Sequence, residues 1–409
     1  MGGTTRESAS PPCTDRSRRG RGRLPARPRE PVTTVRVAVT GASGLVGAHV
    51  LTALVDRGHS VRSLTHRATP DSDSEADTAV IDVTHPESLR AALDGIDAVV
   101  HCAAPYSYDL EPAQLQSSAV DGTRNVLTAA AAVGARRVVI TSSSVTCGSA
   151  STAKAVDESH EPRGEYEPAY FRAKWDQEQV ALELGPSLGI EVVVACPTVV
   201  LGGPDRRLVP SNAIVARYLR DVTRTTYPGG CNVVAATDVG TGHVLLLENG
   251  VPGRRYLLGG ENLTWPELHA LVSELTGLPG PYSQAPASIV SALAIAAAQW
   301  GRLTDRPPFV TEQEAATIGR FYWYCSDLAR SLGYRPASAR TAVAQSLASL
   351  LASEHLPGWV RGTLRVAPEV YEARPLRPRP LRPRPLDLPA RTRRPRRVPV
   401  RPAERPDPE

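Results

Sequence analysis

The sequence predicts an α/β fold, a doubly wound parallel sheet with a smaller C-terminal part and disordered tails. Two observations carry this prediction. From residue 34 onward, short segments that are apolar on both faces alternate with helical segments, as in a parallel sheet covered by helices on both sides. The first of these segments also enters a glycine-rich turn directly before an apolar helix.

The strands follow from their apolar composition and their spacing along the chain. They are expected at 35–39, 60–65, 79–83, 97–104, 136–143 and 191–197. A first helix should end at Arg57 with Gly58 as its C-cap. Thr84 and Glu87 have the spacing of a capping box for a helix through Leu93.

Two longer helices complete the pattern. One is expected over 112–133 and should end at Gly134, and the other should begin near Tyr170. The longest apolar stretch, 289–298, is too short to span a bilayer and is expected to be a buried helix. We therefore expect no membrane association.

Composition separates the ends of the chain from its body. Residues 1–33 contain eight arginines and three acids, and residues 373–409 contain twelve arginines, four acids and 11 prolines. The segment LRPRP occurs twice, at 376–380 and 381–385. Such segments cannot form a packed core, so we interpret both as disordered extensions. Binding of nucleic acid by these basic ends is the less favoured alternative.

The expected organisation is therefore a basic tail over 1–33, a sheet-forming part over 34–200, a second part over 201–355 that returns to the sheet, and an extension over 356–409 that is disordered from about 373. The six cysteines are scattered without C-x-x-C pairs and without histidines at the spacing of a zinc site, so neither a metal site nor a disulfide framework is expected. A reducing compartment, and hence a cytoplasmic location, fits this usage. No apolar segment of the kind found in secretory signals lies near residue 1.

The turn TGASGLVG at 40–47 suits a dinucleotide. Gly41 permits a tight turn, Gly44 lets the backbone approach a pyrophosphate, and Gly47 lets the helix pack close to the sheet. The helix N-terminus then faces the phosphates. Because this turn follows an alternating strand and precedes an apolar helix, it is much more specific than glycines alone.

Lysine is scarce in this chain, since only two occur beside 45 arginines. One of them, Lys174, follows Tyr170 by four residues, so both side chains share one face of a helix. A compact ammonium in this position can lower the pKa of a phenol and make it a proton donor or acceptor. The pair therefore predicts acid/base chemistry.

Several motifs together resemble the extended short-chain dehydrogenase/reductases, whose nucleotide domain is a Rossmann fold. They are TGASGLVG, Asp82-Val83, HCAA at 101–104, Ser142-Ser143, Tyr170-x-x-x-Lys174 and CPTVVLGGPD at 196–205. The segment 256–277 is similar to the NAD-dependent epimerase/dehydratase group, with dihydroflavonol 4-reductase-like proteins and hopanoid-associated sugar epimerases nearest. The resemblance covers residues from about 34 to about 352.

The resemblance assigns a role to each matching residue. Tyr170 would be the acid/base, Lys174 would lower its pKa and hold the nicotinamide ribose, and Ser143 would orient the substrate oxygen. Gly41, Gly44 and Gly47 would bind pyrophosphate, Asp82 and Val83 the adenine end, and Ala103 would line the nicotinamide. A homodimer is a further expectation from the family.

The end of the second strand bears on the choice of cofactor. A site specific for NAD presents an acid there, whereas this chain has Thr65-His66-Arg67 and no acid before Asp71. A cation suits a 2′-phosphate, and Arg67 lies one place after the family's usual arginine position. The sequence thus favours NADP over NAD, with Arg67 as the candidate ligand.

We interpret the chain as an NAD(P)-dependent oxidoreductase that reduces a small-molecule carbonyl. A nucleotide-sugar epimerase with retained NAD is the alternative, and a dinucleotide-binding regulator is the non-enzymatic one. A 4,6-dehydratase of this family has an acidic pair after the catalytic hydroxyl, where this chain has Ser144 and Val145. The substrate loops should be 148–168 and 206–226. Candidate contacts with a carbonyl or sugar substrate are Tyr106, Tyr108, Arg206 and Arg207.

Overall fold

The computed structural model describes residues 34–67, 77–104, 106, 110–162, 168–290, 292, 296 and 317–373. The expectations for residues 1–33 and for 374–409 lie outside these ranges. The division of the body at residue 200 stays a prediction.

The larger sheet has seven strands in the order β10-β6-β5-β4-β1-β2-β3, and every neighbouring pair is parallel. Its strands are β1 (Arg36–Thr40), β2 (Ser60–Thr65), β3 (Thr78–Val80), β4 (Ala98–His101), β5 (Arg137–Thr141), β6 (Glu191–Pro197) and β10 (Arg255–Leu258). The first six correspond to the strands expected from the sequence, which confirms the doubly wound sheet. The seventh, β10, comes from residues beyond 200 and pairs with β6.

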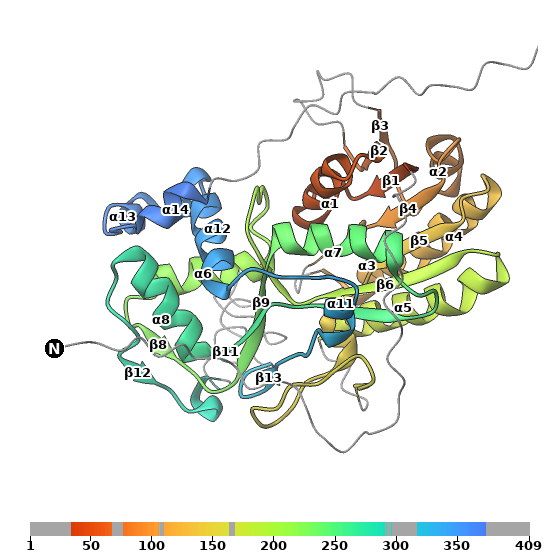
Figure 1. Cartoon of the computed structure of the whole chain (residues 1–409). Helices are drawn as coiled ribbons and strands as arrows, with labels where there is room; N and C mark the ends of the chain where they lie inside the picture. Colours follow the sequence, from red (N-terminus) through yellow and green to blue (C-terminus); the bar gives the residue numbers. More distant parts are fainter. Residues whose placement is uncertain are drawn as a thin grey trace, which may run out of the picture.

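Helices cover both faces of this sheet, as Figure 1 shows. They are α1 (Leu45–Asp56) and α7 (Ala236–Asn249) on one face, and α2 (Pro86–Ala92), α4 (Gly122–Ala132) and α5 (Ala169–Ser187) on the other. Successive residues of β1 lie on opposite faces of the sheet and pack in two different cores. Val37 and Val39 pack in the core with α1 and α7, while Ala38 packs in the other core. This alternation explains why the strands are apolar on both faces.

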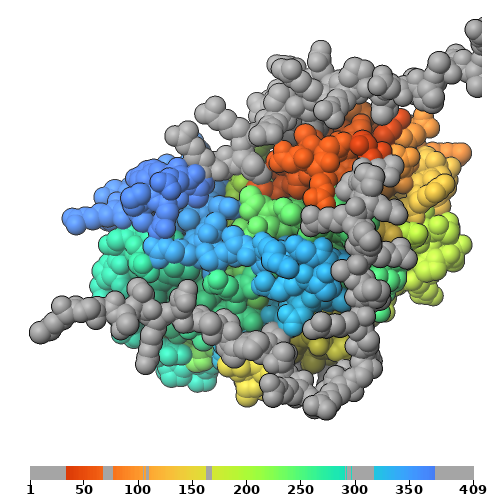
Figure 2. Space-filling view, viewed as in Figure 1, coloured from red at the N-terminus to blue at the C-terminus, as the bar shows by residue number. Residues whose placement is uncertain are grey.

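A smaller sheet lies beside the larger one. Its strands are β7 (Val199–Leu201), β9 (Gly230–Ala235), β11 (Glu261–Thr264) and β13 (Phe321–Tyr322), and β9 pairs with the other three. Strands β8 (Thr225–Thr226) and β12 (Ser283–Gln284) form a separate pair. The helices of this part are α6 (Pro210–Arg220), α8 (Trp265–Thr276), α11 (Asp327–Ser331), α12 (Ala339–Ala352), α13 (Gly358–Arg361) and α14 (Pro368–Glu372). Figure 2 shows the C-terminal described residues, in blue, spread over one face of the molecule.

Two details of the region around α2 differ from the sequence prediction. The third strand ends at Val80, and no capping box forms before α2. Pro86 occupies the first helical position, where its fixed φ suits a helix start, so His85 becomes the N-cap. The hydroxyl of Thr84 instead donates to Asp82 Oδ1 at 2.7 Å.

The expected helix over 112–133 is continuous but contains a π-helical turn. Its segments are α3 (Pro112–Gln116), η1 (Ser117–Asp121) and α4, and Gly134 follows with φ of 80°. Of the apolar stretch 289–298, only its first two residues and two further positions are described. Ile289 is helical but 51% exposed, so the start of this helix is not buried as expected.

Candidate active site

The glycine turn lies between β1 and α1, at the carboxyl ends of β1 and β4. Gly41 has φ of 65°, and a Cβ there would lie 2.8 Å from the backbone nitrogen of Ala103. A Cβ on Gly47 would collide with the carbonyl oxygen of Gly41. Gly44 is the N-cap of α1 and supplies no side chain to cap it. The first-turn amides are therefore available to an anionic group, and the turn fits a pyrophosphate.

The candidate catalytic hydroxyls of Ser143 and Tyr170 are brought together. Ser143 follows β5 and is the N-cap of the short helix η2 (Ser144–Cys147). Tyr170 is in the first turn of α5, and its hydroxyl lies close enough to the Ser143 side chain for Ser143 to affect its pKa. Both residues are buried, Ser143 to 9% exposure and Tyr170 to 6%.

Burial is the main influence on the phenol. It raises the pKa of Tyr170 well above its ordinary value, and the neighbouring Tyr106 raises this pKa further. The two rings lie 5.0 Å apart between centroids. The nearby Ser143 hydroxyl acts in the opposite direction and lowers the pKa. The environment thus favours the neutral phenol, which is the form that can donate a proton.

Lys174 lies one turn further along α5, and its ammonium is buried. It donates to the carbonyl oxygen of Thr141 and to Gln177 Oε1, each at 2.9 Å. Burial lowers the pKa of Lys174 to about 8, so the side chain is mostly charged near neutral pH. The expected effect of this charge on Tyr170 stays a prediction.

A chain of hydrogen bonds continues from Gln177 towards the nicotinamide side of the expected cofactor site. Gln177 Nε2 donates to Thr123 Oγ1 at 2.9 Å, and Thr123 lies 3.1 Å from His101 Nε2. His101 Nδ1 lies 2.7 Å from Thr40 Oγ1, which accepts from the backbone N–H of Ala103 at 3.2 Å. Burial lowers the pKa of His101 to about 3, with Lys174 contributing, so the imidazole is neutral. The sequence interpretation missed Gln177, although its position three residues after Lys174 places it on the same helix face.

The expected adenine end lies at the carboxyl ends of β2 and β3. Asp82 Oδ1 accepts from the backbone and hydroxyl of Thr84, and these bonds lower the pKa of Asp82. The imidazoles of His66 and His85 lie 3.9 and 3.3 Å from Asp82 Oδ2. Arg67 lies two residues after the end of β2 and is exposed.

The other predicted residues are more dispersed. The carbonyl of Val83 accepts from Asn125 Nδ2 at 3.0 Å. Arg206 and Arg207 are both exposed, whereas Tyr108 lies outside the described residues. The expected loop over 148–168 is described at 148–162 and at 168, whereas the prediction of a loop over 206–226 was wrong because these residues include helix α6.

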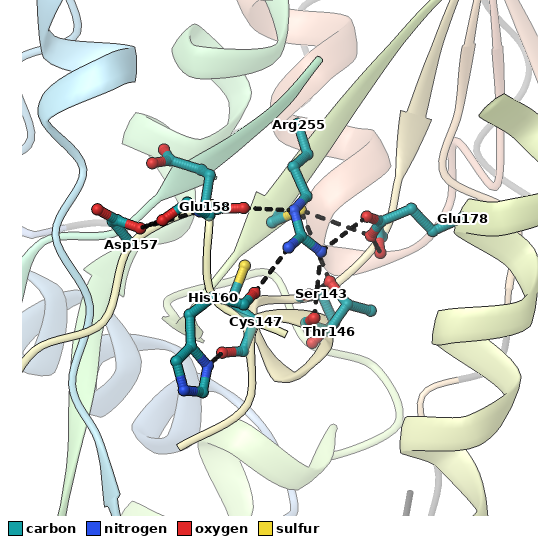
Figure 3. A network of polar contacts seen from close by, with 11 residues as sticks. Ser143, Thr146, Cys147, Asp157, Glu158, His160, Glu178 and Arg255 are labelled. Carbon is teal, nitrogen blue, oxygen red and sulfur yellow. Dashed lines mark hydrogen bonds and ion pairs between the residues drawn. The ribbon is translucent and has the colours of Figure 1, made fainter. Parts of the chain in front are cut away.

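A buried ion pair near Ser143 had no signal in the sequence. Figure 3 shows the guanidinium of Arg255 between Glu178 and the loop that carries Glu158 and His160. Arg255 Nη1 donates to Glu178 Oε1 at 3.2 Å, across 77 positions of sequence.

Within the described ranges, no helix is long and apolar enough to cross a membrane. The same residues hold no group of three potential ligands arranged for a metal ion. The five cysteines among them are free thiols.

Residues 37–259 match the NAD dependent epimerase/dehydratase family. A protein from Synechocystis sp. named putative dihydroflavonol 4-reductase is 33% identical over 257 residues, which cover 61% of this chain and 74% of the relative. Cinnamoyl-CoA reductase 1 of Oryza sativa is 37% identical over 262 residues, covering 58% of this chain and 75% of the relative. The chain is also similar to a solved structure, the UDP-glucose 4-epimerase of Thermus thermophilus in complex with NAD. The TM-score is 0.60 at 21% identity, and the match covers 76% of this chain and 98% of the epimerase. This similarity supports the fold. The chain belongs to the NAD dependent epimerase/dehydratase family and is an enzyme with relatives among its reductases.

Proposed function

We propose that the enzyme reduces the carbonyl of a small molecule and that it prefers NADPH to NADH. The observation that carries this proposal is the closeness of the Ser143 and Tyr170 side chains, with the buried ammonium of Lys174 one turn further along α5. This cluster follows the carboxyl end of β5, the edge at which open α/β sheets bind ligands. The glycine turn fits the dinucleotide at the same edge.

Each residue of the cluster has a defined task in this proposal. A dinucleotide bound at the glycine turn supplies a hydride to the carbonyl carbon. Ser143 and Tyr170 both hydrogen-bond the carbonyl oxygen, and Tyr170 gives its proton to that oxygen as the alcohol forms. Lys174 places a positive charge near the phenol and contacts the nicotinamide ribose. The raised pKa of Tyr170 supports the acid role, because it keeps the phenol protonated until the oxygen becomes basic.

The end of β2 supports the preference for NADPH. Thr65, His66 and Arg67 supply no acid to the ribose hydroxyls, and the exposed Arg67 is available to a 2′-phosphate. Asp82 and Val83 are proposed to contact the adenine, and Ala103 the nicotinamide. A candidate wall of the substrate site is Tyr106, whose ring packs against Tyr170.

The test begins with the nucleotide released from the purified protein on denaturation. We expect an exchangeable site that binds added NADPH more tightly than NADH. Cinnamaldehyde, cinnamoyl-CoA and a dihydroflavonol then serve as carbonyl probes, and consumption of NADPH is followed by its absorbance. Stoichiometric NAD that remains through purification, together with epimerisation of UDP-glucose, would instead identify an epimerase and refute the reductase proposal.

Tyr170→Phe is the matched variant for this assay. It should retain NADPH binding, measured by nicotinamide fluorescence, and lose reduction of whichever probe the wild type accepts. Retention of turnover would remove Tyr170 from the chemistry.

A further inference from the structure

The buried pair of Glu178 and Arg255 joins three segments that are distant in sequence. Glu178 is on α5 and its side chain is 1% exposed, while Arg255 begins β10 and its side chain is 14% exposed. Every guanidinium nitrogen of Arg255 donates a hydrogen bond. Nε donates to the carbonyl oxygen of Glu158 and Nη2 to that of His160, each at 2.7 Å, and Nη1 donates to Thr146 and Glu178, each at 3.2 Å.

This network contacts the chain on both sides of Ser143. On one side, the hydroxyl of Ser142 donates to Glu178 Oε2 at 2.8 Å. On the other side, the carbonyl of Thr146 accepts from Arg255. The remaining contacts of Arg255 hold the loop that returns from η2 towards α5, as Figure 3 shows.

Helix α5 is attached to the end of β5 through three successive turns. Lys174 donates to the carbonyl of Thr141, Glu178 accepts from Ser142, and the Tyr170 hydroxyl lies beside the Ser143 side chain. The spacing of four residues between Tyr170, Lys174 and Glu178 places them along one face of the helix. The Glu178 contact is therefore one of three that fix the register between the acid/base helix and the serine.

We propose that Glu178 and Arg255 are positioning residues that hold Ser143 within hydrogen-bonding reach of Tyr170. This inference rests on the proposed function, in which both hydroxyls contact the substrate oxygen. A buried ion pair is weak evidence for stability, because desolvation offsets the attraction between its charges. A fully satisfied network does, however, restrict a loop to one geometry, and proton transfer depends steeply on that geometry.

The first experiment measures hydrogen–deuterium exchange and requires no substrate. Arg255→Lys keeps the charge but loses the planar fork, and Glu178→Gln keeps the shape but loses the charge. In both variants, amides of residues 142–160 should exchange at least about tenfold faster, while α1 should exchange as in the wild type. The dissociation constant of NADPH should change by less than about twofold, because the glycine turn does not contact the pair.

Arg137→Lys is the matched control. Arg137 forms an ion pair with Glu191 between β5 and β6, at the opposite end of β5 from Ser143, with Nε donating at 2.8 Å. Exchange over 142–160 should be unchanged in this variant. If Glu178→Gln does not fold, Arg255→Lys decides the outcome.

The second experiment is a double-mutant cycle with whichever carbonyl probe the wild type reduces. Arg255→Lys should lower kcat by about 10–100-fold and leave KM for NADPH unchanged. In a Ser143→Ala background, the same change should cost less than about threefold further, because the positioned hydroxyl is already absent. A purely structural role would produce the full loss in both backgrounds.

The two proposals fail in different ways. If the wild type turns over no carbonyl probe, the proposed function is contradicted, while exchange still tests the pair. Unchanged exchange over 142–160 in both variants, or a rise that also includes α1, would overturn the positioning role. Additive losses in the cycle would overturn it as well.

Discussion

The burial of Glu158, in the loop that Arg255 contacts, predicts a measurable dependence of stability on pH. One carboxylate oxygen accepts from the backbone N–H of Leu257 at 2.9 Å, and the backbone carbonyl accepts from Arg255. Burial raises the pKa of Glu158 from 4.5 to about 7, and Asp157 adds to this rise. The bond from Leu257 and the charge of Arg255 act in the opposite direction.

The direction of the resulting pH dependence follows from the raised pKa. The folded chain holds this proton more tightly than the unfolded chain, so unfolding releases it between pH 4.5 and about 7. The contribution of Glu158 to stability is complete below pH 4.5 and is lost as the pH rises through about 7. At about 1.4 kcal/mol per pKa unit, the free energy of unfolding loses about 2.5 kcal/mol from this group between about pH 5 and about pH 8.

The perturbation is Glu158→Gln, which keeps the shape and an acceptor for Leu257 but cannot ionise. The assay is urea unfolding of both proteins, followed by circular dichroism at the two pH values. The free energy of unfolding of the wild type, relative to the variant, should fall by about 2.5 kcal/mol from the lower to the higher pH. Equal slopes of free energy against urea concentration would show that the unfolding transition is the same in both proteins.

Buried histidines give the stability of both proteins the opposite dependence on pH. Burial lowers the pKa of His49, His243 and His269 to about 4 and that of His101 to about 3. Because the folded state disfavours their charged forms, their contribution is lost as the pH falls below about 6.5. Both proteins contain these residues, so the difference between them isolates Glu158. An identical pH dependence in wild type and variant would refute the reasoning.

Further predictions concern the proposed site. Arg67→Ala should weaken NADPH binding by about 1–3 kcal/mol more than it weakens NADH binding, as measured by fluorescence titration. Equal weakening of both would contradict the proposed contact with the 2′-phosphate. Lys174→Arg and Tyr170→Phe should each lower kcat by at least about 10²-fold. The double variant should be little less active than Tyr170→Phe alone, because the two residues act as a unit. Near-normal turnover of Lys174→Arg would exclude the lysine from catalysis. Gln177→Leu removes an acceptor of the Lys174 ammonium, so the pKa of Lys174 should fall below about 8 and the alkaline loss of kcat should begin at lower pH. An unchanged pH profile would show that Gln177 does not hold the ammonium.

The sheet could be predicted from the sequence because its causes are local. The central strands are apolar on both faces, and the glycine turn needs small residues where β1 meets α1. The capping box before α2 failed for an equally local reason. Pro86 favours the first helical position, which moves the start of the helix one residue beyond the expected register.

The surroundings of the candidate site were harder to predict because they depend on tertiary contacts. Arg255 is an ordinary charged residue at the start of a strand, and nothing near it in sequence indicates Glu178. Only the pairing of β10 with β6 brings this arginine beneath the loop after β5. The role of Tyr170 could be predicted from its spacing to Lys174, but its closeness to Ser143 requires β5 and α5 to pack in one register.

The end of β5 and the face of α5 together suggest why the functional residues are spaced as they are. Thr141, Ser142 and Ser143 present a carbonyl and two hydroxyls in succession, and α5 meets them with Lys174, Glu178 and Tyr170. A shift of α5 by one residue along its axis would turn this face away and break all three contacts together, since side chains share a face only at spacings of three or four residues. The three contacts therefore form or break together. A substitution at Glu178 should for this reason also affect the placement of Tyr170, although the two side chains are two helical turns apart.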